Sequence, residues 1–155
     1  METTKTNALE QLILSAFAKD CLEGLLADKK YLSSKYFYDQ RGSEIFQDIM
    51  RMPEYYLTDC ELEIFEKQKE EIFLAFSSHS SSFELVELGA GDGLKTKILL
   101  SHFLNQDIDF EYVPIDISES SLNQLLADLD QEFPRLKPRG LIGDYFHLLE
   151  ELNHQ

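Results

Sequence analysis

The chain has 155 residues, a length that fits one domain, or one domain with an extra arm, and excludes two independent catalytic domains. Apolar residues make up 43% of the sequence, enough for a hydrophobic core and too many for a disordered acidic chain. The 14 Lys and Arg stand against 29 Asp and Glu, and the net charge of -15 repels phosphate backbones and anionic lipid headgroups. Neither nucleic acid nor a membrane is therefore expected as a partner.

No part of the sequence indicates membrane insertion, export or a metal site. Apolar runs stay short of the roughly 18 residues that span a bilayer, and Met1 to Asn7 form a polar start without a basic leader. Cys21 and Cys60 lie in apolar-periodic segments without metal-ligand spacing, and the four histidines lack the spacing of zinc ligands. We expect reduced cysteines and a cytoplasmic protein without a bound metal.

The amino-terminal part of the sequence combines helical periodicity with many aromatic residues. Apolar residues recur at helical spacing over Ala8–Leu26, which predicts one amphipathic helix or two short ones. Five of the seven tyrosines fall within residues 31–56. A short helix is expected among them, from about Arg41 to a point before Pro53.

A longer helix is expected next, followed by a serine-rich linker. The helix should span about Asp59–Phe76, because Thr58 and Glu61 have the spacing of a capping box. Its acidic residues, beginning with Glu61, are expected to form a solvated face. Residues 77–82 are rich in serine and are interpreted as the linker.

After this linker, short apolar runs alternate with helical patterns, which is typical of parallel strands joined by helices. The expected elements are strand Phe83–Leu88, helix Leu94–Asn105, strand Phe110–Ile115, helix Ser118–Phe133, strand Gly140–Ile142 and a short helix within Tyr145–Gln155. Right-handed crossovers would place the three strands side by side. The predicted fold class is therefore α/β, with helices first and a parallel sheet after them.

A glycine-rich loop follows the first predicted strand. Gly89, Gly91 and Gly93 allow a tight turn and a close approach of the backbone to a ligand. The dinucleotide fingerprint would require glycine at the position of Leu94, and the Gly-Lys-Ser/Thr sequence of a P-loop is missing. Such a loop, with the acidic Glu87 before it, suits a ligand without a pyrophosphate, such as S-adenosylmethionine.

Two aspartates follow the next two predicted strands. Asp116 ends the second strand, and Asp144 comes after the third, just before Tyr145. The carboxyl ends of parallel strands share one edge of a sheet, where open α/β folds bind ligands. Asp116 can accept hydrogen bonds from ribose hydroxyls, and Asp144 from an adenine amino group on which Tyr145 stacks. The alternative is that each aspartate only forms a turn or caps a helix.

Several segments together indicate a known family. They are Lys35-Tyr36-Phe37-Tyr38-Asp39, Arg41-Gly42-Ser43, Pro53-Glu54-Tyr55-Tyr56-Leu57-Thr58, Glu87-Leu88-Gly89-Ala90-Gly91, Lys95-Thr96, Pro114-Ile115-Asp116-Ile117-Ser118 and Gly143-Asp144-Tyr145. In them the sequence resembles the S-adenosylmethionine-dependent L-histidine Nα-methyltransferases of ergothioneine biosynthesis and their relatives. Generic methyltransferases share the glycine loop but lack the aromatic block before it.

The resemblance implies a Rossmann-like, class I methyltransferase sheet and an enzyme that methylates the amine of an amino acid. The residues expected to bind the methyl donor, with the loop residues included, are Tyr38, Glu87, Gly89, Gly91, Lys95, Asp116, Asp144 and Tyr145. Tyr55 is expected to contact the amino acid substrate. Residues 1–82 would form a helical region whose aromatic segment faces substrate and cofactor, and residues 83–155 part of the donor-binding domain.

The sequence looks like the amino-terminal half of a member of this family, since full members are longer. In the family's strand order the first strand is central, so a sheet truncated after three strands would leave Phe83–Leu88 with unpaired backbone groups. Self-association through this edge is expected. One alternative is a truncated, non-catalytic binding or assembly module. The other is an NAD-dependent oxidoreductase, which the glycine spacing disfavours.

Methyl transfer requires alignment and a dry aromatic environment more than a strong acid or base, so the sequence identifies no catalytic residue. Tyr38, Tyr55 and Tyr56 either face a cationic group or pack against the sheet. Lys95 is unusual because it would lie near the positive end of a helix dipole. That position favours a specific function, such as pairing with a carboxylate.

Overall fold

The structure is a computed structural model that describes residues 15–78, 81–106 and 108–152. Contacts within the chain divide it into two compact units, Met1–Phe37 and Tyr38–Gln155. The helices of residues 40–77 therefore group with the sheet by their contacts, whereas the sequence assigned them to a separate amino-terminal region. A functional division at residues 82 and 83 stays a prediction.

The first unit is helical in its described part. It contains α1 (Ala16–Leu26) and the short 3-10 helix η1 (Ser34–Phe37). The Tyr36 hydroxyl of η1 donates a hydrogen bond to the Asp20 carboxylate of α1 at 2.7 Å, which links the two helices. The predicted amino-terminal helix is confirmed from Ala16 onward, and its first residues lie outside the described part of the chain.

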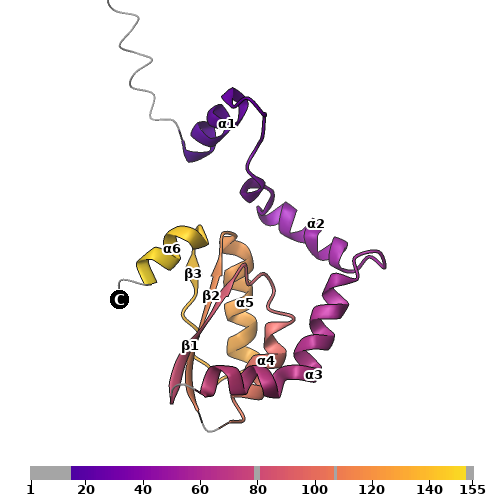
Figure 1. Cartoon of the computed structure of the whole chain (residues 1–155), viewed down its shortest axis with the longest axis vertical. Helices are drawn as coiled ribbons and strands as arrows, with labels where there is room; N and C mark the ends of the chain where they lie inside the picture. The colour runs from indigo at the N-terminus through magenta and orange to yellow at the C-terminus, as the bar shows by residue number, and fades with distance from the viewer. Residues whose placement is uncertain (1–14, 79–80, 107, 153–155) are drawn as a thin grey trace, which may run out of the picture. The chain divides into compact units, whose positions relative to one another are not determined.

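The second unit contains a three-stranded parallel sheet in the order β1-β2-β3 (Figure 1). Its elements are α2 (Gln40–Met50), α3 (Leu57–Ser77), β1 (Ser82–Leu88), α4 (Thr96–Phe103), β2 (Asp109–Asp116), α5 (Glu119–Glu132), β3 (Leu141–Ile142) and α6 (Tyr145–Leu152). The α/β class and the three neighbouring parallel strands that the sequence predicted are confirmed. In the part of the chain that the structure describes, none of the helices has the length and hydrophobicity of a membrane span.

The start of α3 differs from the prediction. A turn closed by the Tyr55 N–H, which donates to the Met52 carbonyl at 3.0 Å, leads directly into the helix. The helix begins at Leu57, and its N-cap residue forms no side-chain hydrogen bond. Thr58 is buried inside the first turn, so it is not at the N-cap position that a capping box requires. The predicted capping box is wrong, and Glu61 has another partner.

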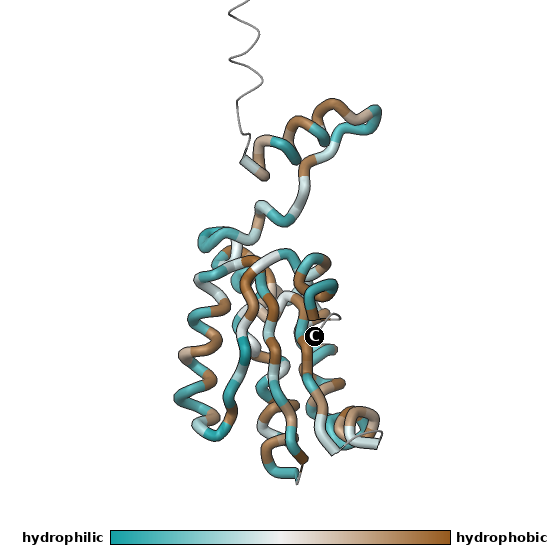
Figure 2. Tube along the Cα trace, turned by 90° about the vertical axis from the view of Figure 1, so that its left-hand side faces the viewer, coloured by the Kyte–Doolittle hydropathy of each residue, from teal (hydrophilic) through white to brown (hydrophobic). Residues whose placement is uncertain are grey.

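The core lies between one face of the sheet and helices α3, α4 and α5. In the register of the central strand, Leu85 of β1 stands opposite Tyr112 of β2, and both contribute to the buried cluster with residues of the three helices. Both crossovers are expected to be right-handed, which brings α4 and α5 to the same face. In Figure 2 the helices alternate between hydrophobic and hydrophilic residues, as amphipathic helices do.

Phe103 of α4 is at the centre of the aromatic part of this core and is fully buried. Its ring lies 5.3 Å from Phe73, 6.2 Å from Phe76, 5.9 Å from Phe83 and 5.7 Å from Phe110, measured between centroids. Tilted and edge-on pairs of this kind add to the free energy of apolar burial. They fix α3 and α4 against both long strands, so the loop between β1 and α4 starts and ends on rigid elements.

Candidate functional site

The glycine loop runs from the end of β1 to the start of α4, and its backbone is fastened to β2. The Gly89 N–H donates to the Ile115 carbonyl at 2.8 Å, and the Gly91 N–H donates to Oδ2 of Asp116 at 2.8 Å. Gly91 and Gly93 have φ angles of 56° and 65°, a region that residues with a side chain rarely adopt. The loop therefore depends on glycine for its backbone path.

The space around the glycines differs along the loop. A Cβ atom at Gly93 would lie 2.5 Å from Cδ1 of Leu125, so glycine here lets the loop pack against α5. A Cβ atom at Gly89 or Gly91 would meet no atom within 4 Å. The surface in front of these two residues is open, and a ligand can approach their backbone closely.

The Asp116 carboxylate joins the ends of several elements. Oδ2 accepts the Gly91 N–H, and Oδ1 accepts the Ser118 N–H, each at 2.8 Å. Ser118 in turn caps α5, since its hydroxyl accepts the N–H of Ser121. Asp116 is only 9% exposed. Because each carboxylate oxygen has more than one acceptor site, the group can hold the loop and still accept hydrogen bonds from ligand hydroxyls.

Asp144 lies at the same edge of the sheet as Asp116. Asp116 pairs with Ile142 of β3 in parallel register, and the Gly143 N–H donates to the Asp116 carbonyl at 3.0 Å. Oδ1 of Asp144 accepts the Phe146 N–H at 3.0 Å, so the helix-cap alternative describes part of its role. Tyr145, which is 41% exposed, leaves part of its ring accessible at this edge.

Glu87 is oriented into the protein beneath the loop. Its two carboxylate oxygens accept hydrogen bonds from the hydroxyls of Thr96 and Tyr112, both of which are buried. Burial raises the pKa of the Glu87 carboxyl, and it also raises the pKa of Tyr112. Glu87 therefore connects the end of β1 to Thr96 of α4 and Tyr112 of β2 beneath the loop. Its predicted contact with a methyl donor stays a proposal.

Lys95 forms an ion pair with the long helix α3. It is the N-cap residue of α4, and its Nζ lies 2.6 Å from Oε2 of Glu61. The expectation that Lys95 pairs with a carboxylate is confirmed. The acidic residues of α3 are exposed, as predicted. Glu61 forms this ion pair from the exposed face, because α3 packs against α4.

The aromatic rings of Tyr38 and Tyr55 both lie beside Phe46. Their rings meet Phe46 edge-on, at centroid distances of 6.2 Å and 6.1 Å. Helix α2, which carries Phe46, packs against α5, and the Ser43 hydroxyl lies 3.5 Å from the Ser118 hydroxyl. These contacts bring α2 to the carboxyl edge of the sheet. No role for Phe46 follows from the sequence, since its contacts with the two tyrosines appear only in the folded unit.

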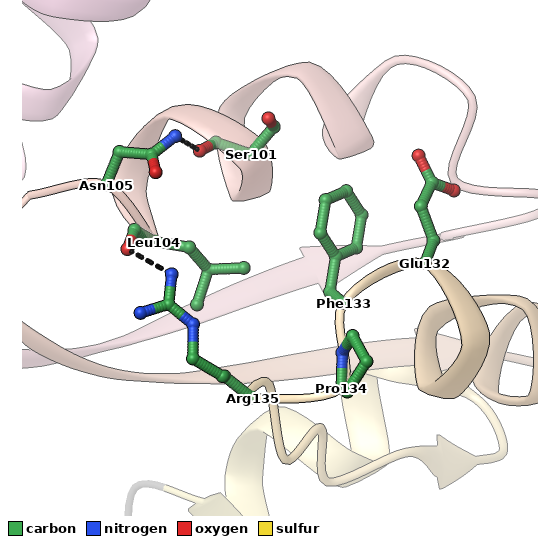
Figure 3. A pocket seen from close by; sticks show the side chains of 7 residues that line it. All are labelled: Ser101, Leu104, Asn105, Glu132, Phe133, Pro134 and Arg135. Carbon is green, nitrogen blue, oxygen red and sulfur yellow. Dashed lines mark hydrogen bonds between the residues drawn. The ribbon is translucent and has the colours of Figure 1, made fainter.

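Two surface pockets lie at the opposite edge of the sheet. The first, of about 190 Å³, is bordered by the carboxyl ends of α4 and α5 (Figure 3). Its polar groups bond within the protein: Arg135 donates to the Leu104 carbonyl at 3.1 Å and Asn105 to the Ser101 carbonyl at 2.8 Å. The second pocket, of about 460 Å³, shares Leu104 and Arg135. Neither contains a residue of the glycine loop.

Replacing Glu87 with Gln should change how stability depends on pH. A carboxyl whose pKa is raised by folding holds its proton more tightly in the folded state, so its contribution to stability falls as the pH rises above the ordinary value of 4.5. The free energy of unfolding of Glu87→Gln, relative to the unmodified protein, should therefore increase from pH 4.5 to neutrality. Urea unfolding at several pH values measures this difference.

The control is Glu71→Gln, which removes a carboxyl from the exposed surface of α3. It should follow the unmodified protein across the same pH range. A Glu87→Gln difference that stays constant with pH, or that decreases as the pH rises, would contradict the assignment of a half-buried carboxyl with a raised pKa beneath the loop.

Comparison with known proteins connects this geometry to a family. The family described as "Histidine-specific methyltransferase, SAM-dependent" matches residues 17–155. The histidine N-alpha-methyltransferase of Mycolicibacterium smegmatis is 33% identical over 139 residues, which are 90% of this chain and 42% of the relative. Ergothioneine biosynthesis protein 1 of Schizosaccharomyces pombe is 31% identical over 154 residues, 98% of this chain and 19% of the relative.

A solved structure of a putative S-adenosyl-L-methionine-dependent methyltransferase from Methanococcus maripaludis is similar with a TM-score of 0.46 and 16% identity, over 74% of this chain and 45% of that one. The chain spans less than half the length of the curated relatives described above. The family match extends over nearly the whole chain and confirms the resemblance seen in the sequence motifs. The protein belongs to the family of S-adenosylmethionine-dependent, histidine-specific methyltransferases.

Proposed function

We propose that this chain forms the half of an S-adenosylmethionine-dependent methyltransferase that binds the methyl donor. The enzyme would methylate the amine of an amino acid, and histidine is the proposed acceptor. The observation that carries the proposal is the open glycine loop, which Asp116 holds at the edge it shares with Asp144. The names of the relatives add support for histidine as the acceptor. The two free cysteines favour a cytoplasmic location.

The residues at this edge fit the parts of the donor. Asp116 would accept the ribose hydroxyls, and Asp144 would accept the adenine amino group while Tyr145 covers the base. The open backbone at Gly89 and Gly91 leaves room for the sulfonium end. Donor contacts are also proposed for Tyr38, Glu87 and Lys95, and a substrate contact for Tyr55. Residues 83–155 would then form most of the donor site.

When bound, the donor supplies a methyl group on a positively charged sulfur. The protein has to align the acceptor amine with that carbon and keep water away. The aromatic faces of Tyr38 and Phe46 can stabilise a cation near this edge, an interaction worth about 0.5 to 2 kcal/mol. Alignment and an aromatic surface, rather than a strong acid or base, are thus what these residues contribute.

Binding of S-adenosylhomocysteine tests the proposed site. Asp116→Asn should weaken it by about 10- to 100-fold, since hydrogen bonds to a charged group contribute about 1.5 to 3 kcal/mol. The matched control is Asp109→Asn, which makes the same change at the other end of β2 and should leave affinity unchanged. Isothermal titration calorimetry gives both values, with thermal melting to verify that each variant is folded.

Calorimetry also separates the competing functions. Binding of S-adenosylmethionine and S-adenosylhomocysteine, without binding of NAD, is the expected result. NAD binding alone would favour the oxidoreductase and contradict the proposal. If none of the three ligands binds, the remaining function is the non-catalytic assembly module.

We further propose that the chain associates with itself through the edge of β1. Within the described residues β1 has a hydrogen-bonded neighbour on one side only, and an open edge is prone to pair with another chain. Leu88 at its end is 47% exposed, which adds apolar surface to that edge. Sedimentation equilibrium over a wide concentration range should show dimers or larger species, whereas a monomer at every concentration would contradict this proposal.

A further inference from the structure

We infer that the Glu61 carboxylate competes with the carboxylate of the ligand for the Lys95 ammonium. This competition sets the affinity of the site for ligands with an amino acid end. The inference rests on the proposed function, because it takes the donor carboxylate as the group that Lys95 receives. It concerns Glu61, which the sequence assigned to a capping box that the structure does not form, and to which the proposed donor contacts give no role.

The Glu61 carboxylate contacts the Lys95 ammonium directly. Oε2 of Glu61 lies 2.6 Å from Nζ of Lys95, and the two side chains are 50% and 34% exposed. Lys95 is two residues beyond Gly93 and precedes α4 directly. The charge of Lys95 acts on the Glu87 carboxyl beneath the loop, so the ammonium is near the loop, and a carboxylate already occupies part of its hydrogen-bonding capacity.

The position of Glu61 is fixed by the packing of helices. α3 packs against α4, and Phe73 and Phe103 form a tilted ring pair at 5.3 Å between these two helices. Because α3 begins at Leu57, Glu61 lies inside the helix and is not the partner residue of a capping box. Its carboxylate is thereby available to Lys95.

Two opposing effects decide the sign of Glu61's influence on binding. Holding the flexible lysine side chain in place favours any ligand that uses its ammonium, but an exposed ion pair contributes little of this kind. The negative charge of Glu61 repels a ligand carboxylate that binds the same ammonium, because the two carboxylates are then separated only by the Lys95 ammonium group. At that separation the repulsion is the larger effect, even with the screening near a protein surface.

The net charge of -15 acts in the same direction as Glu61. A protein this acidic repels anionic groups in general, so the ammonium of Lys95 is the feature that makes the loop accept a carboxylate. Glu61 reduces this attraction. The consequence is weaker retention of both donor and product, which share the amino acid end, while the adenosine part is unaffected.

The test compares two ligands by isothermal titration calorimetry. S-Adenosylhomocysteine has the amino acid end, and 5′-methylthioadenosine lacks it. Glu61→Gln should increase the affinity for S-adenosylhomocysteine by about three- to tenfold, which is the size expected for removing one nearby charge at a partly exposed site. The affinity for 5′-methylthioadenosine should stay the same, because this ligand has no carboxylate to repel.

The matched control is Glu63→Gln, which removes the same charge two residues along α3, where Glu63 pairs with Lys67 of the same helix. It should leave both affinities unchanged. Glu61→Asp keeps the negative charge and should bind S-adenosylhomocysteine nearly as the unmodified protein does.

Each other result overturns the inference. Weaker or unchanged binding of S-adenosylhomocysteine by Glu61→Gln would show that Glu61 does not compete for Lys95. Equal changes for the two ligands would show that the substitution acts through the structure of the loop. If the unmodified protein binds neither ligand, the proposed function fails as well, so the two failures are distinguishable.

Discussion

The carboxylate of Asp116 is the constraint on which the rest of the candidate site depends. It lies at the end of the central strand and accepts one N–H from the glycine loop and one from the first residues of the next helix. Loop, strand and helix thereby keep a fixed relation while the glycine backbone stays open toward solvent. A charged group buried at 9% exposure requires such partners, because an unpaired buried charge is strongly destabilising. The Asp116 carboxylate therefore connects the loop to the start of the next helix, and it is also the best candidate for a ligand contact.

The helices before the three-stranded sheet add aromatic and acidic side chains around Asp116. α2 contributes Phe46, which contacts both Tyr38 and Tyr55, and α3 contributes the carboxylate that pairs with Lys95. Tyr55 and Glu61 are separated by little more than the first turn of α3. The proposed substrate contact, Tyr55, therefore lies just before the helix whose Glu61 pairs with the proposed donor contact, Lys95.

Much of this could be predicted from the sequence, because periodicity and turn residues are local signals. The strands, the helices between them, the glycine loop and the aspartates at strand ends follow from spacing alone. The partners of Glu87 and Lys95 did not follow, since Thr96, Tyr112 and Glu61 reach them only through strand register and helix packing. The capping box failed for a related reason. The turn before α3 starts the helix early and buries Thr58, and a motif of two residues cannot reveal this.

The central claim is that the carboxyl edge of this sheet binds an adenosyl ligand. The most direct measurement is the change in backbone amide chemical shifts when S-adenosylhomocysteine is added to the ¹⁵N-labelled protein. The account predicts the largest changes at Gly91 and Ser118, whose N–H groups donate to Asp116. Changes confined to the pockets at the opposite edge, around Leu104 and Arg135, would contradict it.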